Sequence, residues 1–278
     1  MSSLARPYPD VAALLRRIYA LRHLPTQRAS PHFFLEGVRH FVQACDAEWP
    51  IEAIVCSPKL VPSSLVEMLI RRLKRAGVPE YRVSPEEFRR LSTADRASGI
   101  GALVGKRWTP LAELEPRRGL CFLAIEELRS AGNLGTILRT AEACGVGGVI
   151  FVGDERGCGV SPATKCDPFD PVVMRAGMGG VFHLQLVRTT QAELAAWRTA
   201  RGVRCVGLSP GAASLWTAMP RDEPLCLMVG EERQGLSPAM AALCDVHVRL
   251  PMTGRADSLN VGVAVGVTLY ELVRRTCE

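Results

Sequence analysis

Six short apolar segments between residues 120 and 250 constrain the fold more than any other feature of the sequence. All are predominantly apolar, and 120–125, 149–152 and 225–229 are apolar along their whole length, which is typical of strands buried on both faces. Helical stretches at 135–144, 191–201 and 238–243 lie between most of them. The pattern predicts an α/β fold with a parallel sheet covered by helices. The predicted strands are 120–125, 149–152, 182–187, 203–208, 225–229 and 246–250.

The first third of the chain shows a shorter alternation of its own. Residues 10–47 have apolar positions at helical spacing, including Phe33, Phe34, Val38 and Phe41, and are predicted to be helical. Predicted strands follow at 51–56, 81–83 and 102–104, with helices at 63–76 and 85–91. The stretch 106–118 contains two prolines and is predicted to be a linker. The expected domains are therefore 1–110 and 119–278.

Composition and charge narrow the class of protein. Of 278 residues, 47% are hydrophobic and 22% are charged, no apolar run reaches membrane-spanning length, and the first residues lack the order of a secretory signal. We therefore expect a cytoplasmic globular protein with no membrane partner. Ten cysteines occur without a CxxC pair, which predicts reduced thiols. Cys158, Cys166 and His183 fit no common zinc spacing, so no metal site is expected.

The positive charge is concentrated at one end of the chain. Residues 1–118 hold 19 Lys+Arg and 12 Asp+Glu, whereas residues 119–278 hold 15 and 16. A cluster of four basic residues lies within 71–75. This asymmetry favours a polyanion such as RNA as the partner of the N-terminal part. The alternative is an arginine-rich solvated face, since 30 of the 34 basic residues are Arg.

The segment 250–275 combines a strand end, a break and a helix. The break contains Pro251 and Gly254, and Asp257 or Ser258 is expected to cap the helix that follows. Glycines and alanine inside this helix predict that another element approaches its backbone closely, either in ordinary helix–sheet packing or as a tightly passing chain or ligand. These small residues are Gly262, Ala264 and Gly266.

Three strand ends lead into loops rich in glycine and polar residues. The loops span 126–135, 229–236 and 250–260, and in a parallel sheet ligands bind at loops of this kind. Neither a GxGxxG after the first strand nor a GxxxxGK[ST] occurs, so dinucleotide or nucleoside-triphosphate binding is poorly supported.

Taken together, the three loops resemble the signature motifs of the SpoU (TrmH) family of RNA ribose 2′-O-methyltransferases in the SPOUT superfamily. The matching runs are NLGTILRTAEACGVGGVIFVG, VGEERQGLSP and LPMTGRADSLNVGVAVGVTLYE, with CDPFDPVVMRAGMGGVFHLQLV as a further family segment. The resemblance implies a parallel-sheet domain with a deep C-terminal trefoil knot, a smaller ribosomal-protein-like N-terminal domain that binds substrate, S-adenosylmethionine as cofactor, and a homodimer. It would also explain the small residues of the last helix by a chain threaded beside them.

The same resemblance assigns residues to roles. The family's essential positions fall on Asn133, Arg139, Glu232, Ser258 and Asn260. Arg139 matches the catalytic arginine; because a guanidinium has no free acceptor, orienting the 2′-hydroxyl or stabilising the forming alkoxide is the easier role to defend than acting as base. Glu232 is expected to orient Arg139 or Asn133, while Asn133, Ser258 and Asn260 also suit helix capping. The loops expected to hold the cofactor contain Val229, Gly230, Gly235, Leu250, Met252 and Leu259.

Three positions depart from the family pattern. Arg233 and Gly177 stand where glycine and serine are usual, and Gly262 replaces a serine. The favoured function is methylation of ribosomal RNA, because the resemblance of the basic N-terminal part is to relatives acting on that RNA. The alternatives are a tRNA methyltransferase, an antibiotic-resistance methylase of ribosomal RNA, and a non-catalytic RNA-binding or assembly protein that keeps the knot.

Overall fold

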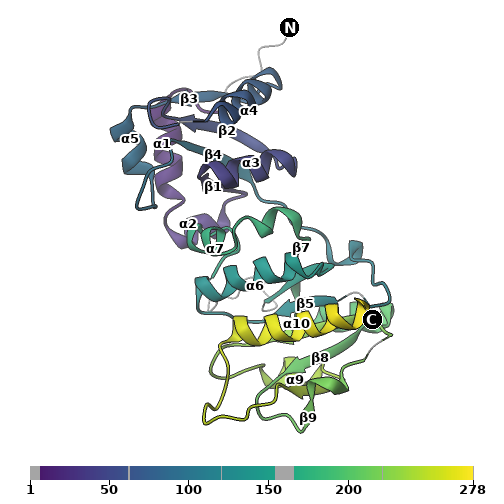
Figure 1. Cartoon of the computed structure of the whole chain (residues 1–278). Coiled ribbons are helices and arrows are strands. Elements are labelled where there is room, and N and C mark those ends of the chain that lie inside the picture. Colours follow the sequence, from purple (N-terminus) through teal and green to yellow (C-terminus); the bar gives the residue numbers. More distant parts are fainter. Residues whose placement is uncertain (1–6, 62, 120, 154–165, 221, 278) are drawn as a thin grey trace. The chain divides into compact units, whose positions relative to one another are not determined.

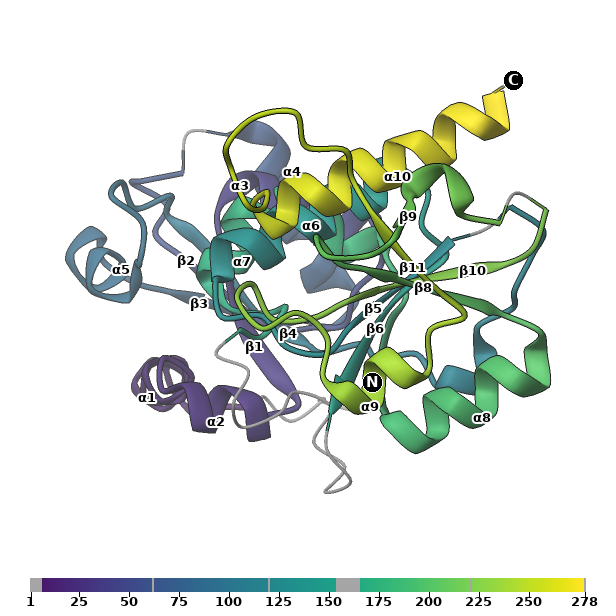
Figure 2. The ribbon, with the colours of Figure 1, turned by 90° about the horizontal axis from the view of Figure 1, so that it is seen from below.

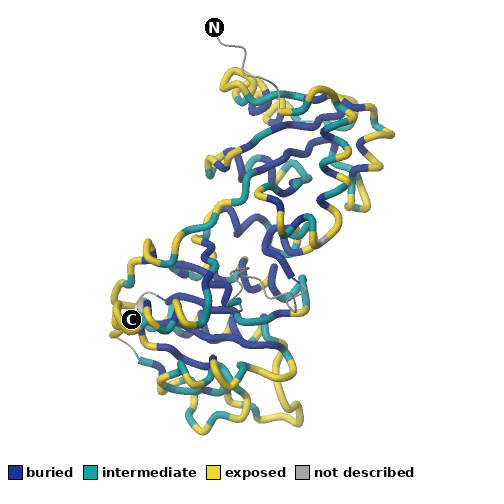
Figure 3. The backbone as a smooth tube through the Cα atoms, turned by 180° about the vertical axis from the view of Figure 1, so that it is seen from behind, coloured by how far each residue is buried: buried dark blue, intermediate teal, exposed yellow. Residues whose placement is uncertain are grey.

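The computed structural model describes residues 7–61, 63–119, 121–153, 166–220 and 222–277 (Figure 1). It divides the chain into two compact units, Met1–Arg107 and Trp108–Glu278, and each has its own sheet. In both units the central strands of the sheet are the most completely buried segments (Figure 3).

The first unit is built on a four-stranded mixed sheet in the order β1-β4-β2-β3. The central strand β4 runs antiparallel to β1 and β2, and β3 runs parallel to β2. The strands are β1 (His32–Glu36), β2 (Ile51–Cys56), β3 (Glu80–Arg82) and β4 (Ile100–Gly105). The helices are α1 (Val11–Ala20), α2 (Leu24–Ala29), α3 (Val38–Asp46), α4 (Ser64–Arg75) and α5 (Pro85–Leu91).

The prediction of helix throughout 10–47 is wrong for β1. Its residues alternate between half-buried and buried, with Phe33 and Leu35 inward, and they pair along their whole length with β4. Gly37 follows at φ +111°, a conformation that L-residues rarely adopt, so strand and helix are separated there. The phenylalanines mimicked helical spacing only because a strand and a helix adjoin across this glycine.

The second unit is built on a seven-stranded sheet in which every pair is parallel, as predicted from the apolar segments. Its order is β7-β6-β5-β10-β8-β11-β9. The strands are β5 (Cys121–Ile125), β6 (Gly148–Gly153), β7 (Leu186–Thr190), β8 (Arg204–Leu208), β9 (Ser214–Leu215), β10 (Leu225–Val229) and β11 (Val246–Arg249). The helices are α6 (Ala131–Ala143), α7 (Pro171–Ala176), α8 (Gln191–Arg201), α9 (Pro238–Ala242) and α10 (Val261–Cys277), with short 3-10 turns at Leu111–Glu113, Gly180–His183 and Trp216–Ala218.

Helices cover both faces of this sheet. Figure 2 shows α6 and α10 along one face and α8 and α9 against the other. On the second of these faces Phe122 of β5 meets Trp197 of α8 edge to face, with ring centroids 5.3 Å apart. The strand predicted at 182–187 is displaced, because Phe182 lies in a 3-10 turn and β7 begins only at Leu186.

The segment expected to be a linker is largely packed onto the second unit. Trp108 makes edge-to-face contacts with Phe151 and Phe169, and the Arg188 guanidinium lies 3.8 Å from its ring centroid. Leu114 is fully buried in the sheet core. Most of the predicted linker is therefore part of the second unit.

The described residues can be examined for membrane-spanning helices, clusters of metal ligands and disulfides. No helix among them is long and apolar enough to cross a bilayer. Within the described ranges no three His, Cys, Asp or Glu side chains gather where they could hold a metal ion. Eight described cysteines are free thiols, six of them buried, whereas Cys158 lies outside the described residues.

Candidate active site

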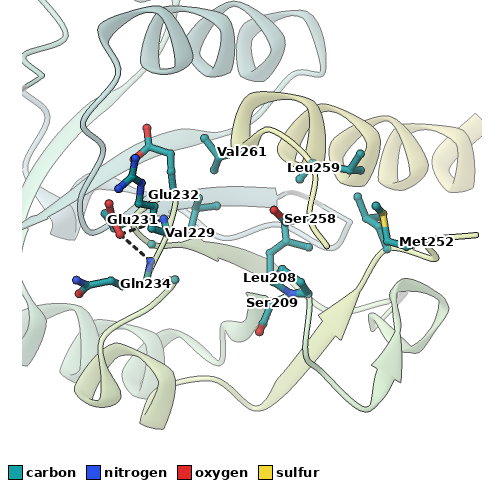
Figure 4. A pocket seen from close by; sticks show the side chains of 16 residues that line it. Leu208, Ser209, Val229, Glu231, Glu232, Gln234, Met252, Ser258, Leu259 and Val261 are labelled. Carbon is teal, nitrogen blue, oxygen red and sulfur yellow. Dashed lines mark hydrogen bonds between the residues drawn. The ribbon is translucent and has the colours of Figure 1, made fainter. Parts of the chain in front are cut away.

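A pocket opens where the carboxyl ends of β8, β10 and β11 meet the start of α10 (Figure 4). All six residues expected to hold a cofactor line it, as do Glu232 and Ser258. The acidic side chains lie on one side of the pocket, and Met252 and Leu259 on the other. The lining is completed by Leu208, Ser209, Pro210, Glu231, Arg233, Gln234, Val261 and Ala264.

One wall of the pocket is a tight hairpin from Glu231 to Gly235. The two residues exchange backbone hydrogen bonds of 3.0 and 2.8 Å, and Gly235 has φ +72°. A Cβ atom at Gly230 would collide with the backbone of Gly235, so only glycine fits. The Glu231 carboxylate accepts the N–H groups of Arg233 and Gln234 at 3.0 and 2.6 Å. The loop is therefore held in one shape by its own backbone.

Arg129 supports this wall from the loop after β5. Its Nε lies 3.2 Å from the Glu231 carboxylate, which is 94% buried, and 3.6 Å from Glu127. A buried carboxylate needs such a partner, since its charge would otherwise be costly to desolvate. Neither Arg129 nor Glu231 was singled out by the motif analysis for this pairing.

Glu232 joins the same hairpin to the start of α6. Its carboxylate accepts the backbone N–H groups of Arg129 and Ser130 and the side-chain amide of Asn133, each at 3.2 Å. Burial raises the pKa of this carboxyl, but the donors from its own backbone, Arg129, Asn133 and Ser130 outweigh burial and lower it. Glu232 is therefore ionised at neutral pH, at the positive end of α6.

Asn133 connects the start of α6 to the start of α10. Its side-chain oxygen accepts the Asn260 amide at 3.0 Å, and the Asn260 oxygen accepts the N–H groups of Gly262 and Val263 at 2.9 and 3.3 Å. We call Glu232, Asn133 and Asn260 the relay. The relay fixes the orientation of the Asn133 and Asn260 side chains, because each amide has one orientation in which both its oxygen and its nitrogen form their hydrogen bonds.

The relay settles two expectations about helix ends. The residue that caps α10 is Asn260, rather than Asp257 or Ser258, and the helix begins at Val261. Asn133 does not cap α6; it lies in the first turn, where its N–H is accepted by the Ser130 hydroxyl at 3.3 Å. Of the two partners expected for Glu232, the structure provides Asn133.

Arg139 is not brought into the relay. It lies six residues beyond Asn133 on α6, so the two side chains are separated by roughly 120° around the helix axis at 3.6 residues per turn. Its side chain is exposed, does not line the pocket, and forms no hydrogen bond or ion pair within the part of the chain that the structure describes. The guanidinium is therefore available to a bound molecule.

Glycines set how closely the helices around the site approach. A Cβ atom at Gly135 of α6 would lie 2.5 Å from the Cβ of Ala176, so α6 and α7 cross at this point only because glycine is there. At Gly262 a Cβ would meet Asn260 at 3.2 Å and Thr136 at 3.5 Å, whereas at Gly266 it would be in ordinary contact with Thr140 at 3.6 Å. The distances to α6 are nearly equal for the two glycines, and the tighter contact at Gly262 comes from Asn260 rather than from α6.

The pocket has the character of a site for a cofactor with an aromatic and a cationic part. Apolar side chains from Val229, Leu250, Met252 and Leu259 form walls suited to a planar ring, and neighbouring backbone groups can meet the polar edge of that ring. The ionised Glu232 carboxylate at the acidic end suits a positive charge. These features fit S-adenosylmethionine, whose sulfonium is cationic.

Fold and site together define a class. The chain belongs to the SpoU rRNA methylase family, whose model matches residues 121–270.

Individual relatives extend the match to nearly the whole chain. The chain is 28% identical over 252 residues to the 23S rRNA (guanosine(2553)-2′-O)-methyltransferase RlmP of Bacillus subtilis, covering 90% of this chain and 92% of the relative. It is also 28% identical to the 23S rRNA (uridine(2479)-2′-O)-methyltransferase of Streptomyces viridochromogenes, covering 87% and 83%. A crystal structure of an AdoMet-bound rRNA methyltransferase from Sinorhizobium meliloti matches with a TM-score of 0.82 at 28% identity, covering 99% of this chain and 97% of that one.

Proposed function

We propose that this protein transfers a methyl group from S-adenosylmethionine to a ribose 2′-hydroxyl of ribosomal RNA. The observation that carries the proposal is the pocket lined by two of the family loops, 229–236 and 250–260. The first family loop, 126–135, is joined to this pocket through the hydrogen bonds of Glu232. Relatives whose names specify 2′-O-methylation of 23S rRNA align with 87–90% of the chain, and therefore with most of the first unit.

The residues of the pocket supply binding and orientation. S-adenosylmethionine, when bound, supplies an electrophilic methyl group. The rigid 231–235 hairpin and the apolar wall from Leu250 to Leu259 would hold it in one pose, which matters because an in-line displacement depends on alignment of the reacting atoms. We assign Ser258, which lines the pocket with an exposed side chain, to the acceptor side.

The relay and Arg139 have different parts in this proposal. The relay holds the 231–235 hairpin and the starts of α6 and α10 in position, because its polar groups bond to one another and to the backbone. Arg139 is exposed and unpaired among the described residues, so its guanidinium can orient the hydroxyl or the adjacent phosphate and stabilise the forming alkoxide. The deep trefoil knot stays part of the proposal; its support is that loops from three strands and the start of α10 meet at one pocket.

We also propose that the protein is a homodimer through α10. Four large apolar side chains lie exposed along one stripe at helical spacing, namely Leu259 just before the helix and Val263, Val267 and Tyr270 on it, with 40, 51, 41 and 58% of their surface accessible. An exposed apolar stripe of this kind marks a protein interface. A second copy of the chain is the partner that the family resemblance implies.

Transfer of labelled methyl groups tests the proposed activity. Purified protein and labelled S-adenosylmethionine are incubated with total RNA from a strain that lacks the gene, and the ribose that gains label is mapped. We expect label at one ribose of ribosomal RNA. Label in tRNA would contradict the substrate class, and cofactor binding without label in any RNA would identify a non-catalytic binding protein.

A further inference from the structure

The last two turns of α4 carry the densest group of basic side chains in the first unit. This unit holds 17 Lys+Arg and 10 Asp+Glu in residues 1–107, whereas residues 108–278 hold 17 and 18. Arg71, Arg72, Lys74 and Arg75 all fall within five residues of α4, and all four are exposed. A basic side chain is available to an outside partner only where it does not already pair with another group of the protein.

Two of the four basic side chains are engaged with the protein. Arg72 donates to the backbone carbonyl of Cys45 at 3.2 Å, and Lys74 pairs with Glu80 at 2.7 Å. Both interactions tie α4 to neighbouring segments of the unit, so these two charges have a structural use.

The other two are largely free. Arg71 reaches Glu67 only at 3.5 Å, with 72 and 61% of the two side chains exposed, and such an exposed pair contributes little to stability. Arg75 forms no hydrogen bond or ion pair within the described ranges of the chain. Their charges are thus available to an outside partner at little cost.

The free arginines line a surface hollow together with one apolar side chain, Met68. Ser64, Glu67, Met68, Arg71, Arg72 and Arg75 line it. Met68 is 58% exposed and Leu65, one turn away, is 45% exposed. Both are large apolar side chains, and neither is among the buried residues of α4. Arg71 and Arg75 are four residues apart, which places them about 6 Å apart along the helix axis. We call Leu65, Met68, Arg71 and Arg75 the α4 face.

We propose that the α4 face binds the sugar–phosphate backbone of the RNA substrate. This inference rests on the proposed function, which supplies the polyanion. Two guanidinium groups stacked one helical turn apart can each grip a phosphate through paired N–H donors, and the neighbouring methionine and leucine can lie against sugars or unstacked bases. The contact gives affinity without reading sequence, as phosphate contacts do.

Salt dependence of RNA binding tests the α4 face. Binding to ribosomal RNA from the deletion strain is measured by filter retention over a series of KCl concentrations for wild type and for Arg71→Ala/Arg75→Ala. Each lost phosphate contact lowers the slope of log K against log salt by about 0.7–0.9, so we expect a decrease of roughly 1.5 and, near physiological salt, roughly tenfold weaker binding. S-adenosylmethionine affinity, measured by calorimetry, should not change.

Two matched variants exclude a general charge or folding effect. Arg89→Ala/Arg90→Ala removes the same charge from the exposed surface of α5 in the same unit, and its slope should stay at the wild-type value. Arg71→Lys/Arg75→Lys keeps the charge and should keep most of the slope. Alanine is the best helix former, so loss of α4 is not expected; a thermal melt by circular dichroism checks this.

The outcomes separate this inference from the proposed activity. An unchanged slope for Arg71→Ala/Arg75→Ala, or an equal loss in the α5 control, overturns the α4 face even if the protein methylates RNA. A specific loss of slope supports the α4 face even if no methyl transfer is detected. Failure of the wild type to bind ribosomal RNA would overturn both.

Discussion

Replacing Asn133 by Asp tests whether the relay holds the site together. The substitution keeps the size of the side chain and its ability to accept from Asn260. It replaces the amide donor that faces Glu232 at 3.2 Å by a second carboxylate oxygen. Two like charges would then share one position at the start of α6.

The cost follows from that distance. Two unit charges 3.2 Å apart repel by about 5 kcal/mol at an effective dielectric constant of 20. Solvent reaches both half-buried side chains, and the pair can instead take up a proton, so we expect a net loss of about 2–3 kcal/mol at pH 7.5. Asn133→Ala loses only hydrogen bonds and should cost about 1–2 kcal/mol at any pH near neutrality.

The pH dependence has a definite sign. In wild type the pKa of Glu232 is lowered, so its contribution to stability is present above its unfolded-state pKa and is lost as the pH falls through the folded value. In Asn133→Asp the pair has a raised pKa, so the variant is closest to wild type at low pH and loses stability as the pH rises. The free energy of unfolding is measured in urea at pH 5 and pH 7.5 and at one protein concentration, because a dimer couples stability to concentration.

The reasoning would be refuted by either of two results. A variant as stable as wild type at pH 7.5 would mean that Asn133 and Glu232 are not neighbours in solution. A penalty that does not shrink between pH 7.5 and pH 5 would mean that charge repulsion is not its cause.

Three further predictions concern the pocket, the chemistry and the dimer. Gly230→Ala should abolish binding of S-adenosylmethionine in calorimetry while leaving a folded protein, because its Cβ collides with Gly235; unaltered affinity would contradict the described hairpin. Arg139→Ala should lower methyl transfer by at least a hundredfold and leave cofactor affinity unchanged, and near-wild-type turnover would remove its catalytic assignment. Val267→Asp should convert the dimer to a monomer in light scattering, since it places a charge within the exposed apolar stripe of α10; a persistent dimer would locate the interface elsewhere.

Much of the second unit is predictable from sequence because its strands are buried on both faces. Segments such as 225–229 are apolar throughout and stand out against their surroundings. The first unit is harder: β1 is half-buried, and its phenylalanines continue into α3 with helical spacing. The two-residue strand β9 is too short to carry any periodicity.

Strand order and side-chain partners lie beyond periodicity. β10 lies between β5 and β8, a neighbourhood decided by pairing between distant segments rather than by either local pattern. The family resemblance indicated which residues belong to the site, but the choice of Asn133 over Arg139 as the partner of Glu232 depends on where each points from α6. A serine three residues before Asn133 was the one local sign that Ser130, and not Asn133, caps that helix.

The position of β10 in the sheet also has a consequence for how the molecule matures. Strands β5 and β8 are synthesised before β10, yet neither has all of its strand neighbours until β10 inserts between them. The ligand pocket further requires residues up to Ala264. Pairings so distant along the chain form slowly. A partly synthesised polypeptide therefore has nowhere to hold the methyl donor, and donor uptake becomes a natural reporter that assembly has finished.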